Sequence, residues 1–502
     1  MNELLTPKEM AKADRLAAEC IGESYPLMLH AGQALAQVIL QRFAHVEGFD
    51  ILCGPGNNGG DGYVLATILR EHGLPVRIWR VSEPADGTDA ARAATECPVE
   101  RFDLMDFRPE RNNLVVDALF GAGLARPLDG VHAEVLQRCI VAGARIVAVD
   151  LPSGVSGETG QVMGTSAPAE LTVTFFRKKP GHLLFPGRSL CGEVVVADIG
   201  IPGNVLQSID VRCRENLPSS WRHLLPRPSF DSHKYRRGHV GVFSGGTSAT
   251  GAARMSAMAA ARIGAGAVTV LSPASALAVN AVHLTSIMLR RVEDEDELGK
   301  FLNERELAAV VLGPGFGLGP KVRSFADLVL RFASKSGRQL KVVLDADALT
   351  GFAGDPQALF EATRANGNAV LTPHEGEFGR IFPDIAAASE LSKVECARQA
   401  AARSGAVIVF KGADTVIAHP GGQTAINSNG TPYLATAGSG DVLAGMIAGL
   451  MAQGMSPFDA ACAAVYLHAE TARSLGPGLI AEDLPGRLPV ILSSYLEQPG
   501  RG

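Results

Sequence analysis

Asp441 follows a turn of small residues and precedes an apolar run with the composition of a helix. The turn spans residues 438–440, and the apolar run begins at Val442. Glycines let backbone N–H groups come close to an anion, and a helix N-terminus adds unpaired donors and positive dipole charge. A carboxylate facing a phosphate repels it, so Asp441 would serve as a base for a substrate hydroxyl or organise a metal. A helix N-cap with an acidic first turn explains the pattern equally well.

The first half of the chain carries polar groups where three apolar runs end. The first of these segments, residues 54–62, holds Asn57, Asn58 and Asp61 among glycines. It lacks the glycine spacing of a dinucleotide fingerprint and the Lys of a P-loop. We interpret it as a preformed cage of oxygens and N–H groups, and a glycine-rich turn capped by Asn and Asp is the alternative.

The other two segments place an acid at the end of an apolar run. Asp117 precedes the loop 121–127, where Arg126 could hold a phosphate with two hydrogen bonds. Asp150 comes before Pro152, which turns the chain, so Asp150 lies at a solvent-facing rim or is catalytic.

A cation site is a further possibility in this half. Asn58, Asp117 and Ser153 are oxygen-bearing side chains at three strand ends, and such a set favours a hard cation over a soft transition metal. His132 and His182 have no second His at ligand spacing, so we expect surface or packing roles for them.

The second half has the same arrangement of polar residues after apolar runs. Glycines at 313–317 follow one run, and His374 follows another, with two acids nearby that could also make it a structural histidine. Lys411 ends a third run, and because a buried Lys without an anion is costly, we expect it to meet phosphate. The small residues at 251–253 permit close approach of a ligand, although tight helix packing is the simpler explanation.

The elements that must position these residues read as two α/β layers. In the first half, strands are predicted at residues 50–54, 114–120 and 145–150. In the second half, they are predicted at residues 240–243, 267–271, 309–312, 341–345, 369–371 and 406–410. Continuous apolar strands separated by helical segments indicate parallel sheets covered on both faces. The carboxyl ends of such strands are where open α/β sheets bind ligands.

The chain of 502 residues is longer than one core usually supports, so we expect two domains. Three prolines, Pro218, Pro226 and Pro228, cluster with basic residues between strand-like runs near 194–199 and at 239–244. We therefore predict a first domain at residues 1–213, a linker and entry to the second domain at 214–238, and a second domain at 239–495.

Composition limits the classes of function. With 46% hydrophobic and 20% charged residues and a net charge of -6, the chain is typical of globular proteins and unlike a nucleic-acid-binding one. Its first ten residues lack the apolar run of a secretory signal, and no apolar stretch is long enough to span a bilayer. Eight scattered cysteines at no metal-ligand spacing suggest reduced, mostly buried thiols, so we expect a cytoplasmic protein.

In the first half, the order of the three loops resembles the NAD(P)H-hydrate epimerase family. That family has an Asn-Asn-x-Gly-Asp loop, a Val-Asp-Ala-x-Phe-Gly strand end with an Arg-bearing loop, and an Asp-x-Pro-Ser-Gly turn. These stand here at residues 57–61, 116–126 and 150–154. The resemblance implies a Rossmann-like three-layer sandwich that binds hydrated NAD(P)H, with Asp150 as the acid/base group for inversion at C6.

Further contacts follow from the same resemblance. It implies a potassium ion held by Asn58, Asp117 and Ser153. Ala122 stands where a Thr is expected, so its ligand contact would be through the backbone only. The implied substrate-binding residues are Asp150 with Asn57, Asn58, Gly59, Gly60, Asp61, Gly121, Ala122, Gly123, Leu124, Ala125, Arg126 and Pro127.

The second half resembles the ribokinase-like superfamily, and within it the ADP- or ATP-dependent NAD(P)H-hydrate dehydratase branch. The matching motifs are Pro373-His374-x-Gly376-Glu377, Lys411-Gly412-Ala413-x-Thr415 and Gly438-Ser439-Gly440-Asp441. By this resemblance the second domain is a ribokinase-like three-layer sandwich. Nucleotide binding would fall to Lys411, Gly412, Ala413, Asp414, Thr415 and Gly440, and contact with the hydrated dinucleotide to Ala252, Gly315, Gly317, His374 and Asp441.

The resemblance also implies a reaction for Asp441. It would deprotonate the C6 hydroxyl, which attacks the terminal phosphoryl group of the nucleotide, and the phosphate ester would then eliminate to restore the dihydropyridine. The amides of 438–440 would stabilise charge on the transferring group. A Mg²⁺ bridging the phosphates is expected, with Glu377 as the nearby acid. Ala437 replaces a second glycine, which leaves the turn feasible.

Together the two resemblances imply complete repair of hydrated NAD(P)H. The first domain would interconvert the (R) and (S) hydrates, and the second would dehydrate the (S) hydrate, releasing AMP and phosphate from ADP. The adenosine site cannot distinguish ADP from ATP, and we expect ADP, toward which bacterial relatives lean. We expect small-molecule substrates, no nucleic-acid or membrane partner, and a homo-oligomer. The alternative is a small-molecule kinase that phosphorylates a hydroxyl, joined to a non-catalytic N-terminal binding module.

Overall fold

The computed structural model describes residues 2–230, 233–234, 236–332 and 340–496. It contains two compact units, Met1–Arg214 and Glu215–Gly502, and each is described here by itself. Within the predicted linker, the chain belongs to the second unit from Glu215 on. Asp231, Ser232 and Tyr235 of that segment lie outside the described residues.

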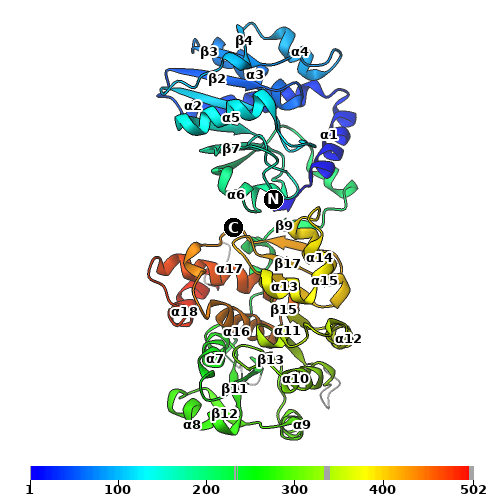
Figure 1. Cartoon of the computed structure of the whole chain (residues 1–502), viewed down its shortest axis with the longest axis vertical. Coiled ribbons are helices and arrows are strands. Elements are labelled where there is room, and N and C mark those ends of the chain that lie inside the picture. Colours follow the sequence, from blue (N-terminus) through cyan, green and yellow to red (C-terminus); the bar gives the residue numbers. More distant parts are fainter. Residues whose placement is uncertain (1, 231–232, 235, 333–339, 497–502) are drawn as a thin grey trace. The chain divides into compact units, whose positions relative to one another are not determined.

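The first unit is built on a sheet with the strand order β4-β3-β2-β5-β6-β7-β8 (Figure 1). Its strands are β2 (Gly48–Cys53), β3 (Val76–Arg80), β4 (Arg101–Asp103), β5 (Asn113–Ala118), β6 (Arg145–Val149), β7 (Leu171–Phe175) and β8 (Glu193–Ala197). All neighbours in this sheet are parallel. In the register, Leu52 pairs with Asp117, and Asp117 pairs with Ala148. The segments that follow β2, β5 and β6 therefore meet at one edge of the sheet.

Helices cover both faces of this sheet. They are α1 (Pro7–Ile21), α2 (Tyr25–Arg42), α3 (Asn57–Glu71), α4 (Asp89–Glu96), α5 (Gly130–Ala142) and the short α6 (Gly187–Leu190). In β2, Ile51 packs into a core with α1 to α4, whereas Leu52 packs into a second core with α5. The alternation of side chains along a strand thus produces three layers. This confirms the α/β class and the strands predicted for the first half.

The chain before α1 is fixed within the first unit by several contacts. The short strand β1 (Glu3–Leu4) pairs antiparallel with Cys213 and Arg214 of β9 (Cys213–Glu215). The Leu5 N–H donates to the Lys178 carbonyl at 3.0 Å, just after β7. These contacts place the start of α1 beside the segment that follows β7.

The second unit has a larger sheet, in the order β18-β17-β16-β15-β14-β13-β10-β11-β12. The strands are β10 (His239–Phe243), β11 (Ala267–Ser272), β12 (Met288–Arg291), β13 (Ala309–Leu312), β14 (Lys341–Leu344), β15 (Ala369–Leu371), β16 (Val407–Phe410), β17 (Val416–Ala418) and β18 (Thr424–Ile426). From β12 to β16 the neighbours are parallel, but β16, β17 and β18 pair antiparallel. The loops 411–415 and 419–423 are too short for a helical crossover, so these strands form hairpins that the sequence analysis did not predict.

Helices again lie on both faces of the second sheet (Figure 1). One core includes α7 (Thr250–Arg262), α16 (Ser439–Ala452), α17 (Pro457–Leu475) and α18 (Asp483–Leu496). The helices α10 (Pro320–Arg331) and α15 (Lys393–Ser404) contact strands of the same sheet but contribute no residue to this core, so they cover the opposite face. The remaining helices are α8 (Ala274–His283), α9 (Glu295–Glu304), α11 (Asp347–Thr350), α12 (Pro356–Asn366), α13 (Glu375–Ile381) and α14 (Pro383–Ala387).

Part of the predicted linker packs inside the second unit. Trp221 is fully buried, and its indole N–H donates to Asn216 Oδ1 at 3.2 Å. Asn216 in turn donates to the Cys462 carbonyl in α17 at 2.8 Å. The segment after Glu215 is therefore fixed to the second unit by buried polar contacts.

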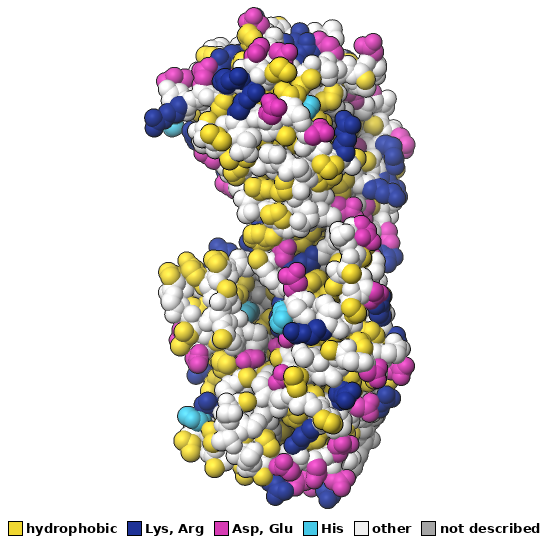
Figure 2. Space-filling model, viewed as in Figure 1, with side chains coloured by type: hydrophobic (Ala, Val, Ile, Leu, Met, Phe, Trp, Pro, Cys, Tyr) yellow, Lys and Arg dark blue, Asp and Glu magenta, His cyan; other side chains and the backbone are white. Residues whose placement is uncertain are grey.

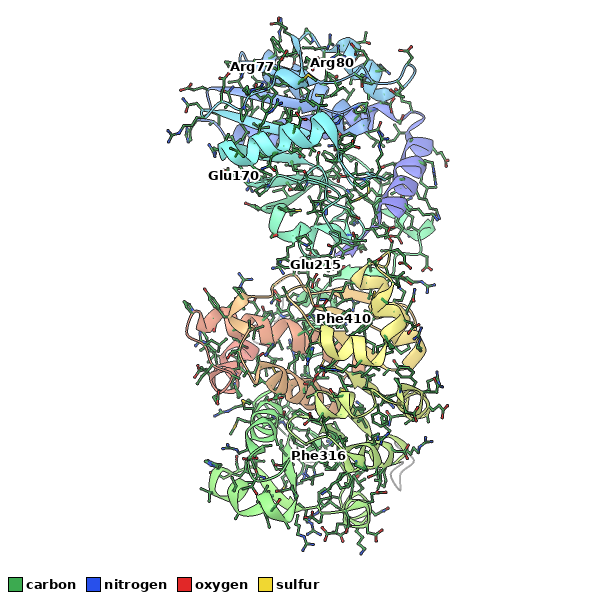
Figure 3. All side chains as sticks on the ribbon, in the orientation of Figure 1. Arg77, Arg80, Glu170, Glu215, Phe316 and Phe410 are labelled. Atoms are coloured by element: carbon green, nitrogen blue, oxygen red, sulfur yellow. The ribbon has the colours of Figure 1, made fainter. Side chains whose placement is uncertain are left out.

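Aromatic contacts fix the ends of several strands in this unit. Phe410, at the end of β16 (Figure 3), stacks on Phe378 of α13 with ring centroids 4.1 Å apart. Phe316, after β13, lies 6.2 Å from Phe243 of β10 in an edge contact. These rings hold the strand ends at the edge of the sheet where the predicted site residues lie.

The surface carries charges of both signs. On the face shown in Figure 2, Lys and Arg side chains are interspersed with Asp and Glu. Among the described helices, none combines the length and the apolar character that crossing a membrane requires.

Candidate active sites

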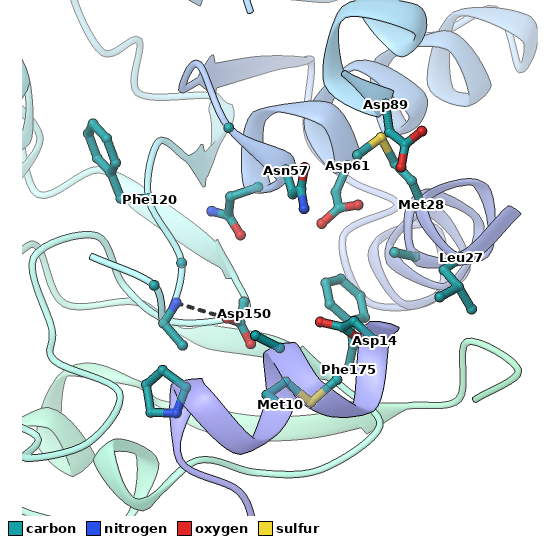
Figure 4. A pocket seen from close by; sticks show the side chains of 18 of the residues that line it. Met10, Asp14, Leu27, Met28, Asn57, Asp61, Asp89, Phe120, Asp150 and Phe175 are labelled. Atoms are coloured by element: carbon teal, nitrogen blue, oxygen red, sulfur yellow. Dashed lines mark hydrogen bonds between the residues drawn. The ribbon is translucent and has the colours of Figure 1, made fainter. Parts of the chain in front are cut away.

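The first unit contains a cavity of about 1100 Å³ at the carboxyl edge of its sheet. The N-terminus of α3, the loop after β5 and the residue after β6 contribute to its wall, and so does the inner side of α1. Asp14, Asn57, Asp61 and Asp150 lie around this one space (Figure 4). The structure thus brings together the three loops that the sequence analysis singled out.

Asp150 is held rigidly at the cavity wall. Its Oδ1 accepts hydrogen bonds from Thr174 Oγ1 at 2.8 Å and Lys179 Nζ at 2.6 Å. Its Oδ2 accepts from the Ala122 N–H at 2.9 Å, the dashed line in Figure 4. The backbone of Asp150 has a φ of 64°, a left-handed conformation that is unusual for a residue with a Cβ. The strain and the three donors together fix the direction of the carboxylate.

The charge state of Asp150 is decided by Lys179. Burial raises the pKa of Asp150, but the ammonium group of Lys179 and the nearby His182 more than offset this effect and lower the pKa to about 2. Lys179 is 2% exposed, and its other partner is the Thr174 hydroxyl at 2.9 Å. Asp150 is therefore an ionised carboxylate at neutral pH, the form that accepts a proton.

His182 supports Asp150 from behind. It is buried in a 3₁₀ turn (Pro180–His182), and its Nδ1 accepts a hydrogen bond from the Lys179 N–H at 2.9 Å. Nε2 therefore carries the proton and donates to the Asp150 carbonyl at 2.7 Å. Burial, followed by Lys179, lowers the pKa of His182 to about 4. The residue is neutral at pH 7 and has a packing role, one of the two roles expected for it.

Two further acids face the cavity without partners. Asp61 of α3 is 8% exposed and Asp14 of α1 is half-buried, and in the described part of the chain neither carboxyl has a hydrogen-bond or ion-pair partner. Burial, and then the Asp150 and Asp14 carboxylates, raise the pKa of Asp61 well above its ordinary value. Burial raises the pKa of Asp14 to about 6 against the lowering effect of Lys179. The cavity therefore holds carboxyl groups in different protonation states.

The three predicted cation ligands lie around the turn at 119–121. Asp117 is fully buried, and its carboxylate accepts from Ser153 Oγ at 2.6 Å and the Ser153 N–H at 2.8 Å. Ser153 Oγ also accepts from the Phe120 N–H at 2.9 Å. Asn58 Oδ1 lies beside Gly121, while Asn58 Nδ2 is buried and has no hydrogen-bond partner among the residues that the structure describes. These atoms form one cluster of polar groups next to the cavity.

Small residues are needed at several points of this wall. A Cβ at Gly121 would lie 2.8 Å from Asn58 Oδ1 and 2.9 Å from Asp150 Oδ2. A Cβ at Gly59 would lie 1.9 Å from the Gly54 carbonyl, and one at Gly60 would lie 2.5 Å from Met28 Cε. Gly121 thus leaves room beside the carboxylate, whereas Gly59 and Gly60 allow close packing of α3.

Not every predicted contact reaches the cavity. The wall includes Asn57, Asn58, Asp61 and the stretch 121–126, in which Arg126 is exposed. Gly59, Gly60 and Pro127 are described but do not line it. The Ala122 N–H is already used by Asp150, so the backbone contact expected there is made within the protein.

In the second unit, Asp441 occupies the first turn of α16. The cap residue Gly438 has a φ of 88°, a left-handed conformation that favours glycine, and no side chain caps this helix. Ser256 Oγ of α7 donates to the Asp441 carbonyl at 2.7 Å. The Ser439 N–H donates to the Thr436 carbonyl at 3.4 Å, so among the described residues the Gly440 and Asp441 N–H groups remain for an anion, and Asp441 is not the cap itself.

Lys411 forms an ion pair with a carboxylate of the protein itself. Its Nζ donates to Asp345 Oδ1 at 2.7 Å and lies 3.7 Å from Glu377 Oε2. A Cβ at Gly440 would lie 3.5 Å from Lys411 Nζ, so the ammonium group is next to the start of α16. The sequence analysis expected a phosphate partner and did not anticipate Asp345, which follows β14 and is 2% exposed.

The pKa of Asp441 is shifted in the opposite direction to that of Asp150. Burial and then the Asp345 carboxylate raise it, Lys411 lowers it, and the result is about 6. Lys411 is hydrogen-bonded to Asp345 and not to Asp441, so its positive charge lowers the pKa of Asp441 less than a direct ion pair would. A carboxylate with a pKa near neutrality is a suitable general base for a hydroxyl.

His374 caps a helix in this structure. Its Nδ1 accepts from the N–H groups of Gly376 and Glu377 at 3.0 and 3.3 Å. Glu377 Oε2 accepts from the His374 N–H at 2.9 Å, which completes a capping box at the start of α13. Nδ1 fixes the ring, Nε2 lies 3.4 Å from Glu377 Oε1, and the imidazole is 54% exposed, so a face of the ring remains accessible to a ligand.

The predicted dinucleotide contacts of α7 and the loop after β13 lie together. A Cβ at Gly315 would lie 3.3 Å from Ala252 Cβ, and one at Gly245 would lie 1.8 Å from the Gly315 carbonyl. The Gly317 N–H donates to Asp347 Oδ2 at 2.8 Å. The glycine loop is thus held between the start of α7 and the segment after β14.

The turn 411–415 is fixed by its own polar groups. The Thr415 hydroxyl donates to the Gly412 carbonyl at 2.8 Å and accepts from the Gly412 N–H at 3.2 Å. Asp414 is 8% exposed and pairs with Lys393 of α15 at 2.5 Å. These two side chains shape the loop, and Ala413 lies at its exposed tip.

The sequence analysis missed three charged residues at these sites. Asp345 directly follows β14 and meets the strand-end criterion that selected Asp150 and Lys411. Lys179 lies beyond the end of β7, a strand that the sequence analysis did not predict. Asp14 lies in the middle of a helix, and no local pattern distinguishes it from a surface acid.

Two family models match the chain. Residues 240–487 match the model described as NAD(P)H-hydrate dehydratase. Residues 24–181 match the model described as YjeF-related protein N-terminus. The two matches fall in the second and first units respectively, so each unit corresponds to one family.

Proteins similar over nearly the full length are known from several organisms. The bifunctional NAD(P)H-hydrate repair enzyme Nnr of Moorella thermoacetica is 37% identical, over 99% of this chain and 97% of that protein. Proteins of the same name are 32% identical in Coxiella burnetii, over 98% and 100%, and 32% identical in Escherichia coli, over 95% and 91%. The similarity therefore includes both units and the segment that joins them.

Proposed function

The chain belongs to the family of bifunctional NAD(P)H-hydrate repair enzymes, and from this premise we propose that it restores NADH and NADPH from their hydrates. The first unit interconverts the (R) and (S) hydrates. The second unit dehydrates the (S) hydrate at the expense of an adenine nucleotide. An epimerase alone only interconverts two damaged forms, and a stereospecific dehydratase alone leaves one of them, so the two activities complete each other.

In the first unit, the reacting carbon binds next to Asp150. C6 of the hydrate carries a hydroxyl and the ring nitrogen, and its inversion requires protons to move at that hydroxyl. The ionised carboxylate of Asp150, with its direction fixed by Lys179, Thr174 and Ala122, is the group that moves them. The cavity of about 1100 Å³ has room for the dinucleotide, and the N-terminus of α3 in its wall favours a pyrophosphate.

A potassium ion in the first unit fits the chemistry of its donors. Asp117 is a buried carboxylate that has no ion-pair partner among the described residues, and Ser153 and Asn58 supply further oxygens. Such a set of hard oxygen ligands matches a hard cation. When bound, the ion would neutralise Asp117 and fix the turn at 119–121 against the substrate.

In the second unit, Asp441 acts as the base. It removes the proton of the C6 hydroxyl, and the oxygen attacks the terminal phosphoryl group of the nucleotide. The C6–O bond of the phosphate ester then breaks, phosphate leaves with the bonding electrons, and C5 loses a proton to water, which forms the C5–C6 double bond; with ADP the other product is AMP. The N–H groups at the start of α16 and the Lys411 ammonium group bind the transferring phosphoryl group. Phosphate is a much better leaving group than hydroxide, and this is the reason that the dehydration consumes a nucleotide.

Loops of the second unit bind the nucleotide and the hydrated dinucleotide. The nucleotide lies along residues 411–415 and Gly440. The hydrated dinucleotide lies against Ala252, the glycines at 315–317 and the exposed imidazole of His374. In the described part of the chain no three His, Cys, Asp or Glu side chains form a metal cluster, so Mg²⁺ would arrive with the phosphates and take Glu377 as its protein acid.

The main support for this assignment is the similarity to known repair enzymes, which includes both sites. A relative of this name is 37% identical over 99% of the chain, and each unit has a carboxylate at its site, Asp150 in the first and Asp441 in the second. We infer ADP as the preferred nucleotide and a homo-oligomeric state from the resemblance. The buried thiols of Cys53, Cys97, Cys139, Cys191 and Cys396 support a reducing compartment such as the cytoplasm.

Repair can be measured directly. The full chain is incubated with Mg²⁺, ADP or ATP, and either the (R) or the (S) hydrate of NADH, and the absorbance band of the reduced nicotinamide is followed. We expect both hydrates to be converted completely, the (R) form after epimerisation. If neither hydrate regenerates the band with either nucleotide, the proposed function is wrong.

A further inference from the structure

The cavity of the first unit contains an acid that lies outside the three loops at residues 57–61, 116–126 and 150–154. Asp14 lies on α1, outside residues 24–181 that match the family model. It lines the cavity together with Asp61 and Asp150, and the three carboxyl groups lie around one space (Figure 4). Asp61, which is nine-tenths buried and has no partner in the described structure, points into the same space. Buried polar groups normally have a hydrogen-bond partner, so carboxyl groups that line a cavity without one in the described structure indicate a polar ligand.

The position of Asp14 is determined by the fold. Thr6 caps α1 in a capping box with Glu9, whose carboxylate accepts from the Thr6 N–H at 2.7 Å. The Leu5 N–H donates a hydrogen bond to the carbonyl of Lys178, which directly precedes Lys179, the ion-pair partner of Asp150. At the other side of the helix, Lys12 Nζ donates to the Ser208 carbonyl at 2.5 Å. The same segment thus positions Lys179 toward Asp150 and α1 toward the cavity.

We propose that Asp14 is the second acid/base residue of epimerisation, working on C6 of the hydrate in partnership with Asp150. The proposal rests on the proposed epimerase activity of the first unit. C6 carries both the hydroxyl and the ring nitrogen, so its carbon–oxygen bond can break with assistance from the nitrogen lone pair. Inversion then needs an acid for the departing hydroxyl and a base for the water that returns from the other face.

The step balances with water as the only co-reactant. Protonated Asp14 donates its proton to the C6 hydroxyl, the C6–O bond breaks with both electrons on oxygen, and water leaves while the nitrogen lone pair forms an N1=C6 bond. Water then adds to the opposite face of C6, the π electrons return to nitrogen, and Asp150 accepts the released proton. No atom is oxidised or reduced. The opposite conversion, or proton exchange with solvent, returns the proton to Asp14.

The electrostatic surroundings support this division of roles. Asp14 faces Lys179, Asp150 and Asp61, while Arg15, Glu19, Asp89 and Arg126 are the other charged groups of the wall. Burial raises the pKa of Asp14 to about 6, so it can both give and take a proton near neutral pH. Burial raises the pKa of Asp61 well above its usual range, so that carboxyl stays protonated and acts as a hydrogen-bond donor. Pairs of carboxyl groups with separated pKa values are typical of acid/base catalysis.

The test uses the full chain without nucleotide, so that the dehydratase is silent. The ratio of (R) to (S) NADH hydrate is followed by chromatography for the wild type, Asp14→Asn, Asp14→Glu, Asp61→Asn and Asp150→Asn. We expect Asp14→Asn to lower the rate by about 10²- to 10⁴-fold and Asp14→Glu to restore part of it. Glu71→Gln, which neutralises an exposed acid at the end of α3, serves as the control with an unchanged rate.

The pH profile separates catalysis from a structural role. Because Asp14 must hold its proton, the wild-type rate should fall as pH rises through the pKa of Asp14 in the substrate complex, and this alkaline limb should be absent in Asp14→Asn. In water labelled with ¹⁸O, each epimerisation should introduce one labelled oxygen at C6. Equal near-ultraviolet circular dichroism of the variants would show that the unit is folded.

Several outcomes would overturn the proposal. The proposal is wrong if Asp14→Asn keeps the wild-type rate and the alkaline limb of the pH profile. It is also wrong if only Asp61→Asn loses that limb, or if epimerisation introduces no ¹⁸O at C6. Failure of the proposed function is distinguishable, since the wild type would then not epimerise at all. If the wild type is active and Asp150→Asn is inactive while Asp14→Asn is normal, only the role of Asp14 is wrong.

Discussion

Asp150 directly follows β6 and Asp441 lies in the first turn of α16, and their surroundings shift their pKa values in opposite directions. Lys179 contacts Asp150 directly at 2.6 Å, and the pKa of Asp150 falls to about 2 although burial acts to raise it. Lys411 instead contacts Asp345, and the pKa of Asp441 rises to about 6 through burial and the Asp345 charge. The position of one ammonium group in each site therefore decides how basic the carboxylate is.

Substitution of Lys179 tests this balance in the first unit. The lowered pKa of Asp150 contributes stability that is present above its unfolded pKa and is lost as pH falls toward about 2. Lys179→Met removes that contribution and leaves a buried carboxylate, so we expect a loss of about 3–5 kcal/mol in the free energy of unfolding. We also expect the acid limb of the epimerisation rate to move to higher pH, because the pKa of Asp150, which burial raises, is then lowered only by His182 and the Ala122 N–H.

Chemical denaturation and the pH dependence of epimerisation measure these effects. Lys8→Met, on the exposed side of α1, is the control and should change neither quantity. An acid limb that stays in place in Lys179→Met would show that Lys179 does not set the charge of Asp150.

Asp441→Asn should abolish dehydration while epimerisation continues. We expect a loss of about 10²- to 10⁴-fold in the dehydration rate, because the amide cannot accept the hydroxyl proton. In the wild type, the rate should fall about tenfold for each pH unit below about 6, since the base must be ionised. Initial rates on the (S) hydrate at several pH values measure both effects.

The stability of Asp441→Asn provides an independent check. A raised carboxyl pKa means stability that is complete below the unfolded pKa and is lost as pH rises through about 6. Near pH 8 the Asn variant should therefore unfold at the same or a higher temperature than the wild type. A clearly lower unfolding temperature would indicate a structural role for Asp441 rather than a purely catalytic one.

At the scale of elements, the position of Asp441 depends on how closely α16 packs on α7. A Cβ at Gly445 would lie 2.1 Å from the Ser256 carbonyl, and one at Gly449 would lie 2.3 Å from Ile263 Cγ2. Ser256 also bonds the Asp441 carbonyl. The two helices can approach to this distance only because glycines face α7, and this approach fixes the first turn of α16 in the site.

Gly445→Ala should separate the two helices. Insertion of a methyl group against a backbone carbonyl in a packed core costs about 1–3 kcal/mol in the free energy of unfolding. We expect the dehydration rate to fall as well, because Asp441 moves with α16, whereas the rate of epimerisation should not change. Thermal unfolding and initial rates on the two hydrates measure these effects.

Gly299→Ala is the matched control for this substitution. Gly299 is also inside a helix, α9, but a Cβ there would meet nothing within 4 Å. This substitution should stabilise the unit by about 0.5–1 kcal/mol, the ordinary difference between glycine and alanine in a helix. If both substitutions stabilise the protein, the packing of α7 on α16 is not the reason for Gly445.

At the scale of the whole molecule, the two reactions use separate sets of residues. Every group assigned to epimerisation lies within Met1–Arg214, and every group assigned to dehydration lies within Glu215–Gly502. Each set is held by the strands and helices of its own unit. The (S) hydrate formed by one chain should therefore be a substrate for another.

A mixture of two inactive variants tests this independence. Asp150→Asn keeps the dehydratase and Asp441→Asn keeps the epimerase, so a mixture of the two full chains should convert the (R) hydrate completely. The rate should depend on the concentration of both variants, as measured by the nicotinamide band. If the mixture converts no more of the (R) hydrate than Asp150→Asn alone, the intermediate does not pass between chains.

Much of the fold and part of each site follow from local patterns in the sequence. Continuous apolar runs between helical segments predict parallel sheets with three layers, and the strands found at 48–53, 145–149 and 407–410 lie close to the predicted ranges. Polar residues at the ends of such runs lie at the carboxyl edge of a sheet, and this places Asn58 and Asp150 in one cavity wall and Asp117 next to it. The hairpins that end the second sheet were not predicted, because their strands are short and lack a distinct apolar period.

The tertiary structure decided which charges meet. Lys179 with Asp150, Asp345 with Lys411, and Asp14 in the cavity of the first unit are far apart in the sequence. The sequence by itself determined the kinds of groups at the sheet edges, because side-chain alternation and helix periodicity are local properties. It did not determine their charge states or partners, because burial and Coulomb interactions depend on distances that only the folded chain sets.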